Sequence, residues 1–183
     1  LGFTAVYVTH DLEEAMAIGD TLAIMDGGTV LQCEAPAVLW SHPASVAVAR
    51  FVGSGPTLRI LDEPMKTGTG LEVKTAAGSF ALAADALAAY QRIVADGQQP
   101  FVYFERSSAI PLHASAATAP ACHFDGSCLR TDFAGDAVDC IIESGGEPLA
   151  VRLPRGQAPQ AGERLRYAVD PARVSVIPYS HIH

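Results

Sequence analysis

The sequence has little positive charge and no long apolar run. Its 12 lysines and arginines stand against 20 aspartates and glutamates, which gives a formal net charge of -8 over 183 residues. Non-specific binding to nucleic acid or to anionic lipid needs basic patches, so neither partner is expected. No run of about 18 apolar residues occurs, and we therefore expect no segment to insert into a bilayer.

Closely paired cysteines are also lacking. The four cysteines are Cys33, Cys122, Cys128 and Cys140, and none forms a Cys-x-x-Cys motif. This pattern favours reduced thiols over a disulfide framework. Cys122, His123 and Cys128, with His113 nearby, leave a metal site open as an alternative. Structural zinc sites need a second ligand pair downstream, which is missing here, so the prediction is that no metal is bound.

What the sequence does contain is enough apolar material for a packed core, since 49% of the residues are hydrophobic. Residues 3–9, FTAVYVT, are apolar and β-branched, which predicts a strand buried on both faces. Asp11 is placed to cap a helix that ends near Gly19. A hairpin is predicted around Asp26-Gly27-Gly28, followed by helices that begin near Pro36 and Pro43 and stop at Gly53.

The pattern changes after Gly53-Ser54-Gly55-Pro56, which reads as a linker. Short strand-like runs then recur about every ten residues, with Gly, Pro or Asp between them, and this spacing predicts a small β-barrel or sandwich. One helix is predicted within this part, over residues 83–95. The fold class expected is therefore α+β overall: α/β elements over residues 1–53, followed by a mainly-β, barrel-like domain over residues 57–178.

His10 is the candidate functional residue of the first part. It follows the predicted strand and precedes the predicted helix, and ligands of open α/β sheets bind at such junctions. A neutral imidazole there can hydrogen-bond a phosphate or orient a water molecule. Position alone leaves a second interpretation open, in which His10 only packs or caps.

Residues 8–53 resemble the end of the nucleotide-binding domain of ABC transporter ATPases, of the subgroup that serves bacterial importers of sugars, polyamines, sulfate, molybdate and ferric iron. The matching residues are Thr9-His10-Asp11, Glu14-Ala15-Met16, Asp20, Met25, Gly28, Gln32, Pro36, Pro43 and Phe51-Val52-Gly53. Leu12, where the family often has Gln, and Cys33-Glu34 depart from the pattern. Residues 57–178 resemble the C-terminal extension of these ATPases, built of small OB-like (TOBE) barrels, with Arg106 retained from a family motif.

The resemblance implies that His10 is the switch histidine, both a catalytic and an ATP-binding residue. In the family this histidine contacts the γ-phosphate and helps to hold the attacking water, a positioning role typical of phosphoryl transfer. Asp11 would be structural. The barrel would serve dimer contact and regulation. The subunit would pair with a second copy and with membrane-spanning permease subunits, as a peripheral protein on the cytoplasmic face of the membrane.

Three motifs that precede the switch histidine in the family are not found before His10: the GxxxxGK[ST] phosphate loop, the LSGGQ signature and a strand ending in Asp-Glu. A phosphate loop supplies the amide cradle and the lysine for the phosphates. We therefore expect a C-terminal fragment of a longer ATPase: ATP and Mg would bind the intact parent, and neither is expected to bind the fragment. The strand over residues 3–9 would then be mobile, swapped or paired across a dimer.

Two rival functions remain. Because most of the chain is barrel-like, it could be a stand-alone module that binds a small oxyanion and has no enzymatic activity. A plain dimerisation domain without a ligand is the other. An OB-like barrel could also suggest single-stranded nucleic acid, but that needs a basic groove with stacking aromatics, and this chain is acidic.

Overall fold

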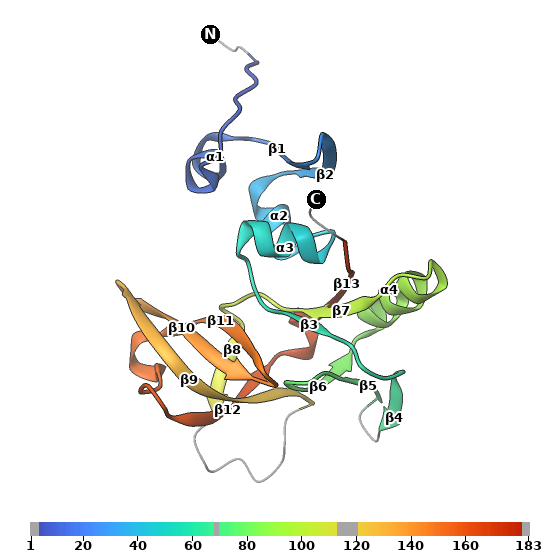
Figure 1. Ribbon diagram of the computed structural model, residues 1–183, viewed down its shortest axis with the longest axis vertical. Coiled ribbons are helices and arrows are strands. Elements are labelled where there is room, and N and C mark those ends of the chain that lie inside the picture. The colour runs from blue at the N-terminus through green and yellow to red at the C-terminus, as the bar shows by residue number, and fades with distance from the viewer. Residues whose placement is uncertain (1–3, 68–69, 113–120, 181–183) are drawn as a thin grey trace.

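The computed structural model describes residues 4–67, 70–112 and 121–180. The first part of the chain forms a small α/β unit whose elements follow one another along the sequence (Figure 1). These elements are α1 (Leu12–Ile18), β1 (Leu22–Asp26), β2 (Thr29–Glu34), α2 (Pro36–Ser41) and α3 (Val46–Val52).

The predicted strand at the N-terminus is not present as a strand. Residues 4–9 belong to no helix or strand, and Figure 1 shows them leading away from the rest of the molecule. Val6 is 92% exposed and Val8 is 89% exposed. A β-strand needs a neighbour for its backbone N–H and C=O groups, and none of the described residues pairs with this segment. The prediction of a strand buried on both faces is therefore wrong for this structure.

The helices of the first part begin and end where their capping residues lie. The Asp11 carboxylate accepts a hydrogen bond from the Glu14 amide at 3.0 Å, which is the predicted cap of α1. Helix α3 begins later than expected, at Val46 rather than near Pro43, because Ser45 is its N-cap and accepts from the Val48 amide. Gly53 ends α3 in the left-handed conformation, with φ 71°, as predicted.

This first part has its own small core. β1 and β2 form an antiparallel hairpin around Gly27 and Gly28, both at positive φ. The buried residues of this core come from β1, α2 and α3 and are Ile24, Leu39, Val48 and Val52.

The rest of the chain is mainly β. Its strands are β3 (Thr57–Arg59), β4 (Met65–Thr67), β5 (Gly70–Lys74), β6 (Gly78–Leu82), β7 (Pro100–Tyr103), β8 (Ala109–Leu112), β9 (Cys122–Ala134), β10 (Ala137–Ser144), β11 (Glu147–Pro154), β12 (Arg164–Val169) and β13 (Ser175–Pro178). The predicted helix is present as α4 (Ala84–Ala95), and single 3-10 turns lie at Arg155–Gln157 and Pro171–Arg173. No helix among the described residues is long and apolar enough to cross a membrane.

Strand β9 organises the sheets. One edge of its first half pairs with β6 and the other with β12, and its second half pairs with β10. The strands run β11-β10-β9-β12-β8, and β8 returns to lie beside β11. The ring is tied by a hydrogen bond from the Arg152 amide to the Arg106 carbonyl at 2.8 Å. This closed ring of five strands is the expected OB-like barrel. β13, β7 and β3 form a separate antiparallel sheet.

Stacked aromatic rings fill the core of the barrel and continue beyond it. Phe80, Phe104, Phe124 and Tyr167 follow one another with centroid separations of 5.8, 5.7 and 4.9 Å, and all four are fully buried. The rings come from four separate stretches of the chain, so their stacking ties the β6 end of the sheet to the barrel.

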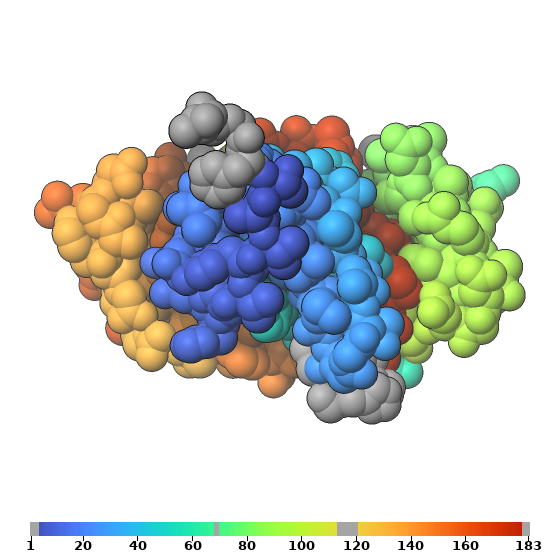
Figure 2. All heavy atoms as spheres, turned by 90° about the horizontal axis from the view of Figure 1, so that it is seen from above, coloured from blue at the N-terminus to red at the C-terminus, as the bar shows by residue number. Residues whose placement is uncertain are grey.

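The two parts meet at a contact that we call the joint, formed by Trp40, Ser54, Tyr103 and Arg106. The Tyr103 hydroxyl donates to the Trp40 carbonyl at 2.7 Å and lies 2.9 Å from the Ser54 hydroxyl oxygen. The Arg106 amide donates to the Ser54 carbonyl at 2.8 Å. Viewed from above, the first part lies over the middle of the molecule, with β9 on one side and α4 on the other (Figure 2).

Candidate functional site

His10 lies at the N-terminal side of α1, directly before the residue that caps this helix. Its side chain is exposed, and the imidazole makes no hydrogen bond to the residues that the structure describes. The neighbouring Asp11 carboxylate is already engaged by the Glu14 amide. Asp11 therefore caps the helix, and the adjacent His10 remains available to a ligand.

The backbone around His10 is held by a small hydrogen-bond network centred on Glu14. The Glu14 carboxylate accepts from the Tyr7 hydroxyl at 3.0 Å and from the Thr9 hydroxyl at 3.3 Å. The Thr9 hydroxyl in turn accepts from the Asp11 amide at 3.0 Å. The hydrogen bond to Glu14, together with the negative charge of its carboxylate, raises the pKa of Tyr7. The network ties the residues on both sides of His10 to the first turn of α1.

A groove of about 400 Å³ runs beside His10. Its walls are residues 5–12 and 21–25, together with Ala15 from α1 and Phe51 from α3. Several apolar side chains of the groove are open to solvent, among them Val6, Met25 and Phe51. His10 therefore borders a hollow that is apolar along much of its length.

The sequence did not predict this groove or the role of Glu14. No pattern in the sequence indicates that the Glu14 carboxylate accepts hydrogen bonds from two hydroxyls that precede the helix. The spacing of Tyr7 and Glu14 is a weak signal on its own, because only the structure shows that the Tyr7 hydroxyl reaches the Glu14 carboxylate. Phe51 is more than twenty-five residues distant from every other part of the groove, so only the fold brings it there.

The cysteine and histidine residues considered as metal ligands do not converge. Cys122 and His123 are consecutive in β9, so their side chains leave opposite faces of the strand. Cys128 shares the buried face with Cys122 but lies six residues further on, which is about 20 Å in a strand. Burial raises the pKa of the Cys122 thiol to about 11. Within the described ranges no three His, Cys, Asp or Glu side chains could hold a metal ion together; His113 lies outside them.

Arg106, the residue retained from the motif of the C-terminal extension, lies at the joint. Its guanidinium is 5.2 Å from the centre of the Trp40 ring and 3.8 Å from the Asp139 carboxylate. Asp139 also accepts two hydrogen bonds from Arg152, at 2.8 and 2.6 Å, and these lower the pKa of Asp139. A chain of charged contacts therefore runs from α2 through Arg106 into β10 and β11.

By class, the fold is an α/β segment followed by an OB-like β-barrel. No protein-family model matches the chain. A solved structure of the cytoplasmic molybdate-binding protein ModG resembles it with a TM-score of 0.54 at 10% sequence identity, covering 67% of this chain and 96% of ModG. At that identity the likeness concerns the fold alone.

The curated relatives define the family more narrowly. The sn-glycerol-3-phosphate import ATP-binding protein UgpC of Chromohalobacter salexigens is 32% identical over 184 residues, 100% of this chain and 44% of that protein. The diacetylchitobiose uptake system ATP-binding protein MsiK of Streptomyces coelicolor is 30% identical, over 98% of this chain and 50% of that protein. UgpC of Psychromonas ingrahamii is 48% identical over 71 residues, 39% of this chain and 18% of its own length.

The chain is thus homologous to C-terminal regions of the ATP-binding subunits of ABC importers, and it spans about half the length of these relatives. The resemblance noted in residues 8–53 and 57–178 is confirmed. A stand-alone oxyanion-binding barrel is not favoured, because the likeness to import subunits extends through the first part of the chain as well as the barrel.

Proposed function

We propose that this chain is the C-terminal part of the ATP-hydrolysing subunit of an ABC importer, which couples ATP binding and hydrolysis to solute uptake. The observation that carries the proposal is the likeness to import ATP-binding proteins over the whole of this chain. His10, whose exposed imidazole lies next to the capped helix α1, is the residue of this chain to which we assign a role in the chemistry.

We further propose a division of the chain into two domains. Residues 1–53 would be the end of the nucleotide-binding domain and residues 57–178 a regulatory barrel. The separate core of the first part, around Leu39, supports this division. The two domains would be joined at Ser54, whose carbonyl accepts a hydrogen bond from the Arg106 amide.

In the intact subunit, His10 would bind the γ-phosphate of ATP and help to orient the attacking water. An imidazole nitrogen can donate to a phosphate oxygen or accept from water, and positioning of this kind supplies much of the rate of phosphoryl transfer. The Glu14 network would hold His10 in place, because it restrains the backbone at Thr9 and Asp11 on either side.

The residues of this chain fit only a part of an ATP site. His10 can meet one phosphate group, but the sequence holds no phosphate loop to cradle the others. Among the described residues no cluster of three His, Cys, Asp or Glu side chains offers Mg a ligand set. We infer that ATP and Mg bind the longer protein, and that this chain alone neither binds ATP tightly nor hydrolyses it.

The partners follow from the same proposal. The subunit would work as a homodimer against two membrane-spanning permease subunits, as a peripheral protein on the cytoplasmic face of the membrane. The described helices offer no membrane-spanning segment of their own. The barrel would contribute to dimer contact and regulation.

Two measurements test the proposal. The reading frame upstream of Leu1 is expected to encode a phosphate loop roughly 150 to 200 residues earlier, since that loop lies near the start of such domains. An upstream reading frame without a phosphate loop would contradict the proposal that this chain is part of an ATPase subunit. Separately, titration of this chain with ATP is expected to show no tight binding. Micromolar binding would refute the inference that the ATP site lies mostly outside the chain.

A further inference from the structure

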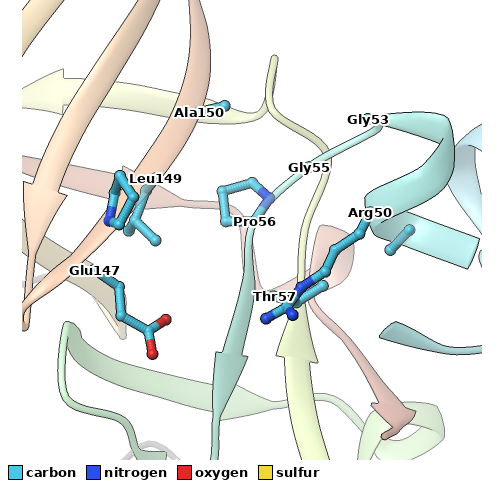
Figure 3. A pocket seen from close by; sticks show the side chains of 10 residues that line it. Arg50, Gly53, Gly55, Pro56, Thr57, Glu147, Leu149 and Ala150 are labelled. Carbon is cyan, nitrogen blue, oxygen red and sulfur yellow. Dashed lines mark hydrogen bonds between the residues drawn. The ribbon is translucent and has the colours of Figure 1, made fainter. Parts of the chain in front are cut away.

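A second hollow lies on the opposite side of α3 from the His10 groove, where the connection between α3 and β3 passes the start of β11. This linker pocket has a volume of about 440 Å³. Small-molecule sites typically range from about 300 to 1,000 Å³, so it is large enough for a metabolite. Its lining residues are Ala49, Arg50, Gly53, Gly55, Pro56, Thr57, Glu147, Pro148, Leu149 and Ala150 (Figure 3).

The walls of the linker pocket are held firmly. Gly53 adopts a left-handed conformation, and a side chain at Gly55 would place its Cβ 1.9 Å from the Phe104 carbonyl oxygen, so the connection lies directly against the backbone that follows β7. Pro56 and Pro148 restrict the backbone on the two sides. A pre-formed pocket of this kind loses little conformational freedom when it binds a ligand.

The pocket contains one cation and one anion that do not pair with each other. The Arg50 Nε lies 3.4 Å from the Thr57 hydroxyl, and its guanidinium has no carboxylate within 4.0 Å among the described residues. The Glu147 carboxylate likewise makes no ion pair or hydrogen bond there. In Figure 3 the Glu147 and Arg50 side chains lie on opposite sides of the chain that leads from Pro56 into β3.

Most of the other side chains that line the pocket are apolar. Pro148 and Ala150 are exposed to solvent, whereas Leu149, at 3% exposed, and Pro56 are buried. A ligand with a single negative charge would be attracted by Arg50 but repelled by Glu147, and a single positive charge would meet the reverse. Only a molecule that carries both charges, separated by a short apolar frame, satisfies both side chains at once.

We propose that the linker pocket binds a zwitterionic small molecule of the α-amino acid class, with its carboxylate on Arg50, its ammonium group on Glu147 and its side chain on Pro148 and Ala150. Because Arg50 belongs to α3 and Glu147 to β11, the bound molecule would bridge the two parts of the chain. The site goes beyond the proposed ATPase function and does not depend on it.

The test is binding of L-leucine to this chain by calorimetry, with two analogues that each lack one charge. L-leucinamide lacks the carboxylate and N-acetyl-L-leucine lacks the ammonium group. Saturable binding of L-leucine is expected, with each analogue weaker by about tenfold or more, the loss typical of one charge-assisted hydrogen bond. L-leucyl-L-leucine, with its charges further apart, is expected to bind more weakly than L-leucine.

Variants assign the binding to the pocket. Arg50→Gln and Glu147→Gln are each expected to weaken L-leucine binding by about tenfold. Arg92→Gln, an exposed arginine on α4 that does not line this pocket, is the matched control and should leave binding unchanged. Circular dichroism of each variant shows whether it is folded.

Three results would overturn the proposal: no saturable binding of L-leucine up to about 10 mM, well above ordinary metabolite affinities; equal binding of L-leucine and either analogue; or folded Arg50→Gln and Glu147→Gln variants that bind as the unaltered chain does. None of these results bears on His10, so the failure of this site would leave the proposed function untouched.

Discussion

The guanidinium of Arg106 lies 5.2 Å from the centre of the Trp40 ring. Trp40 belongs to α2 and Arg106 to the turn before β8, so one cation–π contact joins the first part of the chain to the barrel. The Arg106 side chain is 24% exposed. Water is therefore partly excluded from the contact, which strengthens it relative to an open surface pair.

The strength of this contact can be measured with a double-mutant cycle that combines Trp40→Leu and Arg106→Met. We expect a coupling free energy of about 0.5–2 kcal/mol from urea unfolding, because both variants retain apolar packing and lose only the cation–ring attraction. Asp139, at 3.8 Å, also attracts the Arg106 guanidinium, but that contribution cancels in the cycle. Additive effects of the two substitutions would mean that the ring and the guanidinium do not interact.

Tyr103→Phe is expected to destabilise the fold by about 1–2 kcal/mol. The substitution removes a hydrogen bond to the Trp40 carbonyl and another with the Ser54 hydroxyl, and it leaves these groups without that partner. Tyr7→Phe is the control, since the Tyr7 side chain is 60% exposed and its hydroxyl bonds only the exposed Glu14. Equal unfolding midpoints for Tyr103→Phe and the unaltered protein would contradict the role given to the joint.

Ionisation of Tyr103 is expected to lower the stability of the folded protein in alkali. Burial raises the pKa of Tyr103 to about 12 from its ordinary value of 10.0. A phenol that ionises less readily in the folded state contributes stability that is complete below pH 10 and is lost as the pH rises to about 12. Burial raises the pKa of Tyr167 as well, so the unaltered protein titrates more than one such group. The free energy of unfolding should therefore fall less steeply with pH in this window for Tyr103→Phe than for the unaltered protein. Identical slopes would contradict the raised pKa of Tyr103.

Gly55→Ala should destabilise the protein by about 1–3 kcal/mol, the usual range for an overpacked site. Its Cβ would lie 1.9 Å from the Phe104 carbonyl oxygen, and backbone on both sides must move to admit it. Gly156→Ala is the matched control, because no atom lies within 4 Å of a Cβ there. The thermal unfolding midpoints of the two variants should differ clearly, and similar midpoints would show that the connection is not packed against Phe104.

The exposed segment over residues 4–9 is expected to cause self-association of the chain. Val6 and Val8 are almost fully exposed on a segment whose backbone makes no sheet pairing with the described residues, and such segments seek partners. Light scattering is expected to show concentration-dependent association that Val6→Ser with Val8→Ser reduces. Val94→Ser, at an exposed position on α4, should not change it. A monomer at all concentrations, with an ordered N-terminus, would oppose this expectation.

Local signals in the sequence predicted the helices well. Asp11 as a cap, Gly53 as a helix stop and α4 each depend on residues close together in the chain. The number and spacing of turns predicted a small β-barrel or sandwich, and the OB-like barrel was implied by the family resemblance. The strand predicted over residues 3–9 is absent because an apolar, β-branched run forms a strand only if a neighbouring strand is present to pair with it.

Long-range relationships could not be predicted in the same way. The pairing of β9 with three other strands and the approach of Glu147 to Arg50 depend on closure of the barrel. No local pattern in the chain encodes either one. The assignment of His10 came from a resemblance over some forty-five residues, since position alone left packing and capping open. The structure adds that Asp11 performs the capping, which leaves the imidazole unengaged by the residues described.

The central claim is that His10 acts on the γ-phosphate in the longer subunit. The most direct measurement is ATP hydrolysis by that subunit with His10→Ala, beside His42→Ala, an exposed histidine outside the His10 groove. His10→Ala is expected to lower the hydrolysis rate by about 100-fold or more while ATP still binds, and His42→Ala is expected to hydrolyse ATP normally. Hydrolysis by His10→Ala at the rate of the unaltered subunit would contradict a role for His10 at the γ-phosphate.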